Sequence, residues 1–349
     1  MFSRWFVLVV LFTVRVYAGS LGDDANAYLA KKRDEAQLVG VSAAIGLNGI
    51  VIWEGAAGLA NIEDNIAATP QTTHRIASIS KAMTATAVMQ LVEQGRMRLD
   101  APIQEYVATF PQKEQGTILI QHLLSHTSGI RHYGPSENHT MIHYDTLLDA
   151  TKVFQDDPIG FAPGARYKYT TYGYTLLGAA LEKASGESFR EYMREHVWGP
   201  AGMTHTDLGL LGQVPAEHFE LYIRNKEGEV KRDIYDDLSV KYPAGGMIST
   251  AGDLVRFAFA LDSGKLVKPE SLALMRTVPQ VEGKRRIDYG YGLIVGEDWN
   301  KELGTFYGHD GGQSRAAHPR AGAVLRSRDP RRRRNARARD HVGLDQDWG

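Results

Sequence analysis

The sequence contains no cysteine among its 349 residues. This absence excludes disulfide frameworks, thiol nucleophiles, cysteine-ligated zinc or iron–sulfur centres and lipid anchors on cysteine. A large net charge is also lacking, because 40 Lys and Arg balance 41 Asp and Glu and leave a formal charge of -1. The chain as a whole therefore lacks the excess of positive charge that binding to nucleic acid or to an anionic membrane requires, and we expect neither as a partner.

Long hydrophobic runs are lacking beyond the first residues. At the N-terminus, Arg4 precedes an apolar stretch over residues 5–14, and residues 16–18 are of the apolar or small kind that a signal peptidase reads. Arg15 interrupts this stretch well before the roughly 20 apolar residues that a membrane-spanning helix needs. The pattern predicts a cleaved secretory signal at residues 1–18, no stable membrane anchor, and export to the periplasm or the extracellular space.

The composition is that of a globular protein, with 43% hydrophobic and 23% charged residues. A length well above about 150 residues favours two lobes or one large domain with an insertion. Near the N-terminus, apolar β-branched runs at 41–47 and 50–54 flank Asn48-Gly49, a dipeptide typical of a type I′ hairpin turn. A second pair of strand-like runs lies far downstream, at 289–296 and 303–307.

Between these two blocks the sequence is mostly helical, and Ser188 with Glu191 forms a capping box at one expected helix start. We therefore expect an α/β (α+β) fold, with an antiparallel sheet built from both ends of the chain, flanked by helices and interrupted by a mostly helical insertion. The expected boundaries place the sheet lobe at 19–96 and 245–314, and the helical lobe at 97–244.

The end of the chain departs from this pattern. Residues 315–349 hold ten Arg, four Asp and no Lys, and they contain no alternating apolar run. One interpretation is a solvated basic tail. We favour a shift of the coding frame near Ser314, because every lysine lies at or before Lys301 and the tail is dominated by Arg, Ala, Gly, Asp and Pro, as a GC-rich gene read out of frame would be. The tail is then disordered, and the strands that should complete the sheet are missing.

A candidate nucleophile occurs in the tetrad Ser78-Ile79-Ser80-Lys81, an S-x-x-K pattern at the start of an expected helix. Three residues along a helix bring Lys81 to the same face as the Ser78 hydroxyl. Burial would lower the pKa of Lys81, and a neutral amine can help to take the serine proton. The amide of Ser78, at the positive end of the helix dipole, can stabilise an oxyanion. The tetrad alone is short enough to occur by chance, and by itself it equally fits a capped helix with a surface lysine.

Two further elements change that interpretation: Tyr169-Thr170-Thr171-Tyr172-Gly173 opens an expected helix, and His309-Asp310-Gly311-Gly312 follows an expected strand. Together with the tetrad they resemble the serine β-lactamase and penicillin-binding-protein superfamily, in its class C-like branch of esterases, peptidases and related serine hydrolases. Longer blocks share the resemblance in order and spacing over about residues 40–314. The segments 125–133 and 243–247 are most similar to the mitochondrial serine β-lactamase-like proteins and their bacterial relatives.

The resemblance implies a role for each of these residues. Ser78 would be the acylated nucleophile, and Lys81 its partner in proton transfer. Tyr169 would match the tyrosine of the Y-x-N motif and act as general base on Ser78, then as acid to the leaving group. Thr171 stands where many relatives carry asparagine and would orient the substrate. The amide of Gly312 would be the second oxyanion donor beside that of Ser78.

The segment His309-Asp310-Gly311 would replace the K-T-G motif of the superfamily. In its penicillin-directed members the lysine of that motif supplies a positive charge that binds a substrate carboxylate. A titratable histidine at this position favours ester or peptide hydrolysis over efficient β-lactam destruction.

Other interpretations of the same residues exist. Tyr169 could be a core aromatic, and His309 an ordinary loop histidine. Five histidines lie close together in the sequence, and a zinc site there is conceivable, but no H-E-x-x-H motif accompanies them. They are at positions 122, 126, 132, 139 and 143. The nucleophile elbow G-x-S-x-G, a P-loop and a dinucleotide-binding fingerprint are absent. We therefore expect no metal and no cofactor.

Three hypotheses about function follow. The leading one is an exported serine hydrolase that cleaves ester or peptide bonds of small-molecule or peptide substrates through an acyl-enzyme. The second is a β-lactamase or D-Ala-D-Ala carboxypeptidase that acts on cell-wall-type substrates. The third is a non-catalytic or defective relative, because the C-terminal tail does not supply the strands that the fold needs. The sequence names neither the acyl group, nor the leaving group, nor the oligomeric state.

Overall fold

The computed structural model describes residues 22–134, 137, 139–213, 215, 217–225, 227–233, 236–283, 288–297, 305–312 and 327–328. The predicted signal at 1–18 and most of the arginine-rich tail therefore lie outside the described residues. Within the described part of the chain, no helix combines the length and the apolar character that crossing a lipid bilayer requires.

An N-terminal helix over residues 22–35 precedes the first strand. The strands are β1 (Gly40–Leu47), β2 (Ile50–Asn61), β3 (Ile66–Ala67), β4 (His74–Arg75), β5 (Asp207–Leu208), β6 (Tyr222–Arg224), β7 (Val230–Arg232), β8 (Met247–Ser249), β9 (Ile294–Glu297), β10 (Thr305–Gly308) and β11 (Ser327–Arg328). The α-helices are α2 (Ser80–Glu93), α3 (Ile120–Leu124), α4 (Leu147–Thr151), α5 (Tyr172–Ser185), α6 (Phe189–Tyr192), α7 (Gly199–Ala201), α8 (Tyr242–Gly245), α9 (Ala251–Asp262) and α10 (Pro269–Met275). The 3₁₀-helices are η1 (Ala77–Ile79), η2 (Ile103–Glu105) and η4 (Ser239–Lys241), and η3 (Met193–Trp198) is a π-helix.

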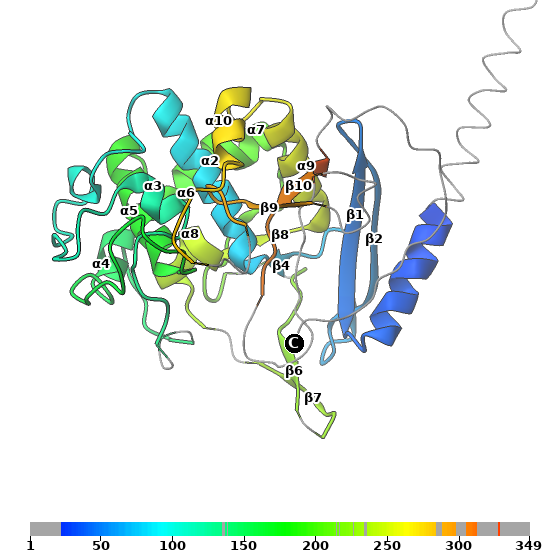
Figure 1. Ribbon diagram of the computed structural model, residues 1–349. Helices are drawn as coiled ribbons and strands as arrows, with labels where there is room; N and C mark the ends of the chain where they lie inside the picture. Colours follow the sequence, from blue (N-terminus) through cyan, green and yellow to red (C-terminus); the bar gives the residue numbers. More distant parts are fainter. Residues whose placement is uncertain are drawn as a thin grey trace, which may run out of the picture.

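The predicted N-terminal hairpin is confirmed as β1 and β2, which pair antiparallel. Asn48 and Gly49 have φ angles of 52° and 86°, the left-handed conformations that a type I′ turn needs. Helix α9 packs on this hairpin (Figure 1). A Cβ on Gly46 would lie 2.5 Å from side-chain atoms of Phe259 and Val255, so the glycine in β1 allows the helix to approach closely.

The expected fold class is confirmed, as a mixed α/β fold with small antiparallel sheets and helices. Among the described residues, however, the strands from the two ends of the chain form separate three-stranded sheets, β1-β2-β3 and β11-β10-β9, rather than one continuous sheet. Strand β9 begins at Ile294, later than the expected run at 289. Strand β11 comes from the arginine-rich tail and pairs with Phe306 and Tyr307 of β10. The tail thus contributes one two-residue strand, and its other residues lie outside the described part.

Helix α2 lies at the centre of the molecule, next to α5, α8 and η3 (Figure 1). Nearly all of its side chains are buried, which is typical of a helix covered on every side. Helix α8 approaches α5 closely at Gly178, where an added Cβ would overlap Pro243 and lie 2.8 Å from Leu147. The capping box predicted for Ser188 and Glu191 is confirmed at α6.

A third small sheet, in the order β4-β8-β5, supports the start of α2. The amide of Ile76, directly after β4, donates to the carbonyl of Met247 in β8 at 3.0 Å. This ladder fixes the backbone that leads into η1, the turn that carries Ser78. The hairpin β6–β7 extends away from the body of the molecule below this region (Figure 1).

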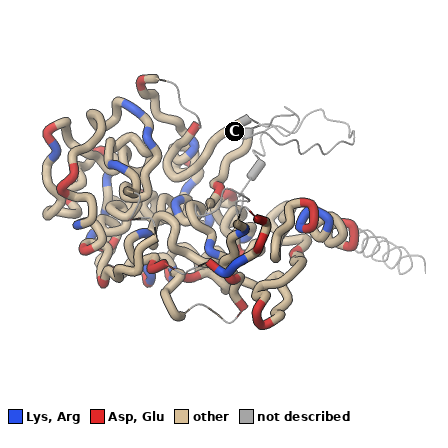
Figure 2. Tube along the Cα trace, turned by 90° about the horizontal axis from the view of Figure 1, so that it is seen from below, with Lys and Arg blue, Asp and Glu red and all other residues tan. Residues whose placement is uncertain are grey.

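Charged side chains of both signs are scattered along the described chain, and no extended block of one sign stands out (Figure 2). This distribution agrees with the near-zero net charge of the sequence.

Candidate active site

Ser78 and Lys81 meet as the S-x-x-K spacing predicts. Ser78 lies in the turn η1, and Lys81 lies in the first turn of α2. The Lys81 Nζ donates to the Ser78 Oγ at 3.1 Å and to the carbonyl oxygen of Ala244 at 2.6 Å. Because α8 supplies that carbonyl, packing of α8 against α2 fixes the amine beside the serine.

Burial lowers the pKa of Lys81 well below its ordinary value. The side chain is fully inaccessible to solvent. The negative charge of Asp310 acts in the opposite direction, whereas the positive charge of Lys241 lowers the pKa of Lys81 further. A neutral amine next to a hydroxyl can accept the proton of that hydroxyl during nucleophilic attack.

Tyr169 lies just before α5 and faces the same amine. The Lys81 Nζ is 4.8 Å from the centre of the Tyr169 ring. Burial raises the pKa of Tyr169 well above its ordinary value, and hydrogen bonding with Ser78 opposes this shift. Tyr169 is therefore a neutral phenol that can donate a proton, and it can act as a base only if a neighbour takes its own proton.

Two non-glycine residues beside these groups adopt left-handed backbone conformations. Ala77, which directly precedes Ser78, has a φ of 46°, and His126 has a φ of 58°. The His126 ring is buried with its centre 4.2 Å from that of Tyr169 and 4.6 Å from that of Tyr289. Strained residues of this kind cluster at functional sites, where surrounding structure holds them.

The segment after β10 lies directly against the turn that carries Ser78. A Cβ on Gly311 would overlap the carbonyl oxygen of Ile76 and lie 3.3 Å from the Cβ of Ala77. Only glycine therefore fits at position 311 without a shift of one backbone. Gly312 lines the same cleft as Ser78, at the end of this segment.

His309 is buried and neutral. Its Nε2 accepts from the hydroxyl of Tyr289 at 2.9 Å, and its Nδ1 donates to the carbonyl of Asp310 at 2.5 Å. Burial, assisted by the charge of Lys81, lowers the pKa of His309 to about 3. The sequence predicted a titratable histidine at this position. With so low a pKa, the imidazole of His309 carries no charge near neutral pH.

Thr171 is the N-cap residue of α5 and lines the cleft beside Tyr169. Its amide donates to the Nδ1 of His132 at 3.1 Å. Burial, with smaller contributions from nearby lysines, lowers the pKa of His132 to about 4, so this ring is a neutral acceptor. The Thr171 side chain also hydrogen-bonds with Tyr133, another residue of the cleft.

Behind these groups lies a buried ion network that the sequence analysis missed. Arg75 Nη1 contacts Asp236 Oδ1 at 2.7 Å, and Lys241 Nζ contacts Asp236 Oδ2 at 2.8 Å. Burial alone would raise the pKa of Asp236, but hydrogen bonds and charge from Arg75 and Lys241 outweigh it and hold this pKa at about 2. No local pattern of the sequence marks Asp236 or Lys241 as partners of Arg75.

A cleft of about 410 Å³ connects these residues. One end of it is lined by Ser78, Tyr169, Thr171 and Gly312, and Arg75, Asp236 and Lys241 also line it. Apolar residues form much of the remaining wall. They are Leu38, Val39, Leu59, Phe219, Leu221, Ile223 and Val230.

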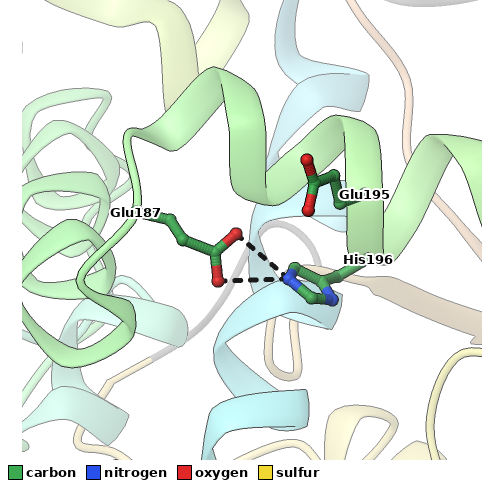
Figure 3. Close-up of side chains that lie close together, drawn as sticks. All are labelled: Glu187, Glu195 and His196. Atoms are coloured by element: carbon green, nitrogen blue, oxygen red, sulfur yellow. Dashed lines mark hydrogen bonds and ion pairs between the residues drawn. The ribbon is translucent and has the colours of Figure 1, made fainter.

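The five clustered histidines have different environments. His126 and His132 pack around Tyr169, and the His143 Nδ1 contacts Asp237 Oδ2 at 2.8 Å. In the described part of the chain, the one group of three ligand-type side chains close enough to hold a metal is elsewhere (Figure 3). It consists of Glu187, Glu195 and His196. The His196 Nε2 contacts both carboxylate oxygens of Glu187, at 3.1 and 3.2 Å, so hydrogen bonding between these two side chains accounts for this arrangement.

The mixed α/β fold, with a serine and a lysine in contact at the start of a buried central helix, is that of the serine β-lactamase and penicillin-binding-protein superfamily. The chain belongs to the beta-lactamase family, whose sequence model matches residues 25–345. The match extends beyond the expected region of 40–314 at both ends and includes much of the arginine-rich tail. The chain therefore has the fold of the β-lactamase-family serine hydrolases.

Individual relatives agree with this assignment. The chain is 27% identical to the human mitochondrial serine beta-lactamase-like protein LACTB, covering 74% of this chain and 63% of LACTB. A penicillin binding protein from Bacillus halodurans is 28% identical with a TM-score of 0.71, covering 81% of this chain and 87% of that chain. A D-stereospecific amidohydrolase from Streptomyces is 25% identical with a TM-score of 0.69, covering 83% and 87%. The chain spans about 63% of the length of the mammalian LACTB proteins.

Proposed function

We propose that the protein is an exported serine hydrolase that cleaves ester or amide bonds through an acyl-enzyme on Ser78. The observation that carries this proposal is the 3.1 Å contact between Lys81 Nζ and Ser78 Oγ, made where burial lowers the pKa of Lys81 well below its ordinary value. The Ser78 oxygen attacks the substrate carbonyl, its proton passes through Lys81 and Tyr169 to the leaving alcohol or amine, and the acyl group stays on Ser78. Water then attacks the acyl carbon, the acid leaves, and Ser78 regains its proton.

The other cleft residues have supporting roles in this proposal. The amides of Ser78 and Gly312 stabilise the oxyanion, and Thr171 orients the substrate. The high pKa of Tyr169 makes it a proton donor to the leaving group, with Lys81 as the group that first receives the serine proton. No metal and no cofactor enters this chemistry.

The neutral state of His309 supports a preference for ester or peptide substrates. A charged lysine at that position would add a cation to the cleft, whereas a neutral imidazole offers only hydrogen bonding. The similarity to an amidohydrolase supports amides as one substrate class. We therefore propose small esters, amides and short peptides as substrates.

Covalent labelling tests the mechanism. A fluorophosphonate should add once, at Ser78, in a mass spectrum of the intact protein, and Ser78→Ala should abolish both the label and the hydrolysis of p-nitrophenyl esters. Ser263→Ala is a matched control, because Ser263 is the C-cap residue of α9 and lies outside the cleft. Unchanged ester turnover in Ser78→Ala would remove the proposed mechanism.

A second candidate function is favoured by the likeness to a penicillin binding protein. A β-lactamase or D-Ala-D-Ala carboxypeptidase would form an acyl-enzyme with benzylpenicillin, so the same mass measurement after incubation with penicillin separates this function from the first. Rapid penicillin adducts with poor labelling by neutral esters would favour it.

Export and integrity of the chain are separate proposals. We propose that residues 1–18 are removed on export, and N-terminal sequencing of the mature protein tests this.

If the tail after Ser314 is read out of frame, the product is a defective relative. A fully labelled but slowly turning-over Ser78 would favour that third candidate.

A further inference from the structure

His126 holds the backbone on both sides of Tyr169. The amide of Lys168, the residue before Tyr169, donates to the carbonyl oxygen of His126 at 2.9 Å. The amide of Thr170, the residue after it, donates to the His126 Nδ1 at 3.2 Å. The imidazole packs on the phenol ring itself, with 4.2 Å between the ring centres. One residue therefore contacts the Tyr169 side chain and fixes the chain before and after it.

His126 occupies a backbone position where glycine is the usual residue. Helix α3 ends in a Schellman motif, in which the amide of Thr127 donates to the His122 carbonyl at 2.8 Å and the amide of His126 donates to the Leu123 carbonyl at 3.4 Å. His126 takes the left-handed position of this motif, with a φ of 58°. A glycine would end the helix with less strain. The histidine side chain therefore serves a purpose other than helix capping.

The contact with Thr170 requires an unprotonated Nδ1, because an amide can donate only to a free lone pair. Burial lowers the pKa of His126 well below its ordinary value, and the charge of Lys81 lowers it further. The neutral ring then carries its proton on Nε2, which is buried and has no hydrogen-bond partner among the described residues. The amide of Thr170 is therefore the group that selects this tautomer.

Two more contacts hold the same segment from the stretch that follows His126. The Thr170 hydroxyl donates to the carbonyl of Arg131 at 2.6 Å, and the Thr171 amide donates to the Nδ1 of His132 at 3.1 Å. These contacts fix the chain where it enters α5. Of the three anchors, His126 is the one that contacts the residues on both sides of Tyr169.

We propose that His126 is a positioning residue for proton donation by Tyr169, and that it acts through its unprotonated Nδ1 by holding the Thr170 amide. This inference rests on the proposed function, because it concerns the step in which Tyr169 protonates the leaving group. In that step the bond between the acyl carbon and the leaving oxygen breaks, and the Tyr169 hydroxyl gives its proton to that oxygen. Lys81 passes to Tyr169 the proton that it took from Ser78. A phenol displaced from hydrogen-bond reach of the leaving oxygen donates poorly.

Two esters with one acyl group measure this proton donation. p-Nitrophenyl butanoate and ethyl butanoate form the same butanoyl-enzyme, so their kcat/KM values compare acylation alone. p-Nitrophenolate is a weak base that leaves without a proton, whereas ethoxide is a strong base that needs one. The ratio of the two values therefore reports on the acid that serves the leaving group. Because both esters are measured on one sample, a loss of folded protein cancels in the ratio.

His126→Phe and His126→Asn separate the two contacts of the side chain. Phenylalanine keeps a ring against Tyr169 but has no acceptor for the Thr170 amide. Asparagine loses the ring but keeps a side-chain acceptor close to the backbone, and it tolerates the left-handed conformation. We expect His126→Phe to lower kcat/KM for ethyl butanoate about tenfold or more beyond its effect on p-nitrophenyl butanoate. His126→Asn should keep most of the wild-type ratio.

The opposite result overturns the proposal. A ratio that is kept by His126→Phe and lost by His126→Asn would show that ring packing, and not the Nδ1 acceptor, positions Tyr169. A wild-type ratio in both variants would show that His126 does not position it at all. His196→Asn is the matched control, because His196 is a hydrogen-bonded histidine outside the cleft, and its ratio should equal that of the wild type.

Tyr169→Phe is the benchmark for these ratios. It should show the same selective loss with ethyl butanoate, and adding His126→Phe should change the ratio no further, since the two changes act through one group. A further selective loss in the double variant overturns the proposal. A selective loss in Tyr169→Phe without one in His126→Phe overturns this inference and leaves the proposed function intact. Equal losses for both esters in Tyr169→Phe contradict the acid role of Tyr169, and the proposed mechanism with it.

Nuclear magnetic resonance tests the contact without catalysis. In protein labelled with ¹⁵N-histidine, near neutral pH, the His126 ring should show an unprotonated Nδ1 and a protonated Nε2. His126→Asn identifies these signals by their loss. Exchange of the Thr170 amide hydrogen should be slow in the wild type and faster in His126→Phe. A protonated Nδ1 in the wild type overturns the proposal whatever the activity, and this result holds even if Ser78 proves not to be the nucleophile.

Discussion

Gly311→Ala tests whether the segment after β10 holds the nucleophile turn in place. The added methyl group would overlap the carbonyl oxygen of Ile76, and it would lie 3.2 Å from the carbonyl carbon of that residue and 3.3 Å from the Cβ of Ala77. Ordinary contacts between carbon atoms are roughly 3.5 to 4.0 Å. Relief therefore requires one of the two backbone segments to move, and the segment at Ile76–Ala77 is the one that leads into Ser78.

The expected cost in stability follows from this overlap. Adding a methyl group to a closely packed site typically costs about 1–3 kcal/mol. For a domain of roughly 150–250 residues, each kcal/mol lowers the melting temperature by about 2–4 °C. The neighbouring Gly312→Ala is the matched control, because no atom of the described residues lies within 4 Å of its added Cβ. An alanine that fits the native backbone can even stabilise by about 0.4–1 kcal/mol through the unfolded chain.

Gly311→Ala should also lower the rate at which Ser78 reacts with a fluorophosphonate. A displacement on the order of 1 Å near a catalytic group can lower the rate by about a hundredfold. Thermal denaturation and the rate of fluorophosphonate labelling at Ser78 measure the two effects, with Gly312→Ala scored for stability alone. Equal melting temperatures for Gly311→Ala and Gly312→Ala, with wild-type labelling in Gly311→Ala, would refute the proposed close approach.

Further predictions concern proton transfer, pH, substrate class and the tail. Lys81→Ala and Tyr169→Phe should each lower kcat with little change in KM, since both act in proton transfer, and an effect on KM alone would contradict these roles. Because the folded-state pKa of Lys81 lies well below its unfolded value, the unfolded chain binds more protons between those two values and stability rises with pH there. Urea denaturation at about pH 7 and about pH 9.5 should show the wild type gaining stability relative to Lys81→Met, and a constant difference would count against a neutral Lys81. His309→Lys should speed acylation by benzylpenicillin in a stopped-flow assay, and no gain would weaken the substrate argument. Resequencing should reveal a frame change near Ser314, and a confirmed frame with a soluble, fully active product would end that idea.

Burying the Lys81 amine and holding Ala77 in a left-handed conformation both cost folding free energy. Lys81 is surrounded by protein, its pKa is lowered by burial, and its amine is fixed by the Ala244 carbonyl and the Ser78 hydroxyl. Ala77 adds a left-handed backbone conformation next to Ser78. The large core around α2 compensates for these local penalties, in keeping with the general observation that strained and desolvated groups persist where surrounding structure holds them.

Local chemistry in the sequence was enough to predict several features. The turn at Asn48-Gly49 and the capping box at Ser188 depend on neighbouring residues only, and both are confirmed. The contact between Ser78 and Lys81 also follows from helical periodicity, because three residues along a helix bring two side chains together whatever surrounds them. The family and the fold class followed from motif resemblance and are confirmed as well.

Tertiary structure alone decided the electrostatics of the site and the continuity of the sheets. The loss of charge on His309 results from burial, which depends on chain segments far apart in sequence. The network of Arg75 with Asp236 joins residues 161 positions apart, and no local pattern encodes such a pairing. Among the described residues, the expected single sheet is replaced by separate small sheets. The reason is that strand pairing depends on which strand edges meet in space, and not on the apolar pattern of each strand. The sequence by itself therefore determined which groups could react, and the fold determined their charge and the surfaces they face.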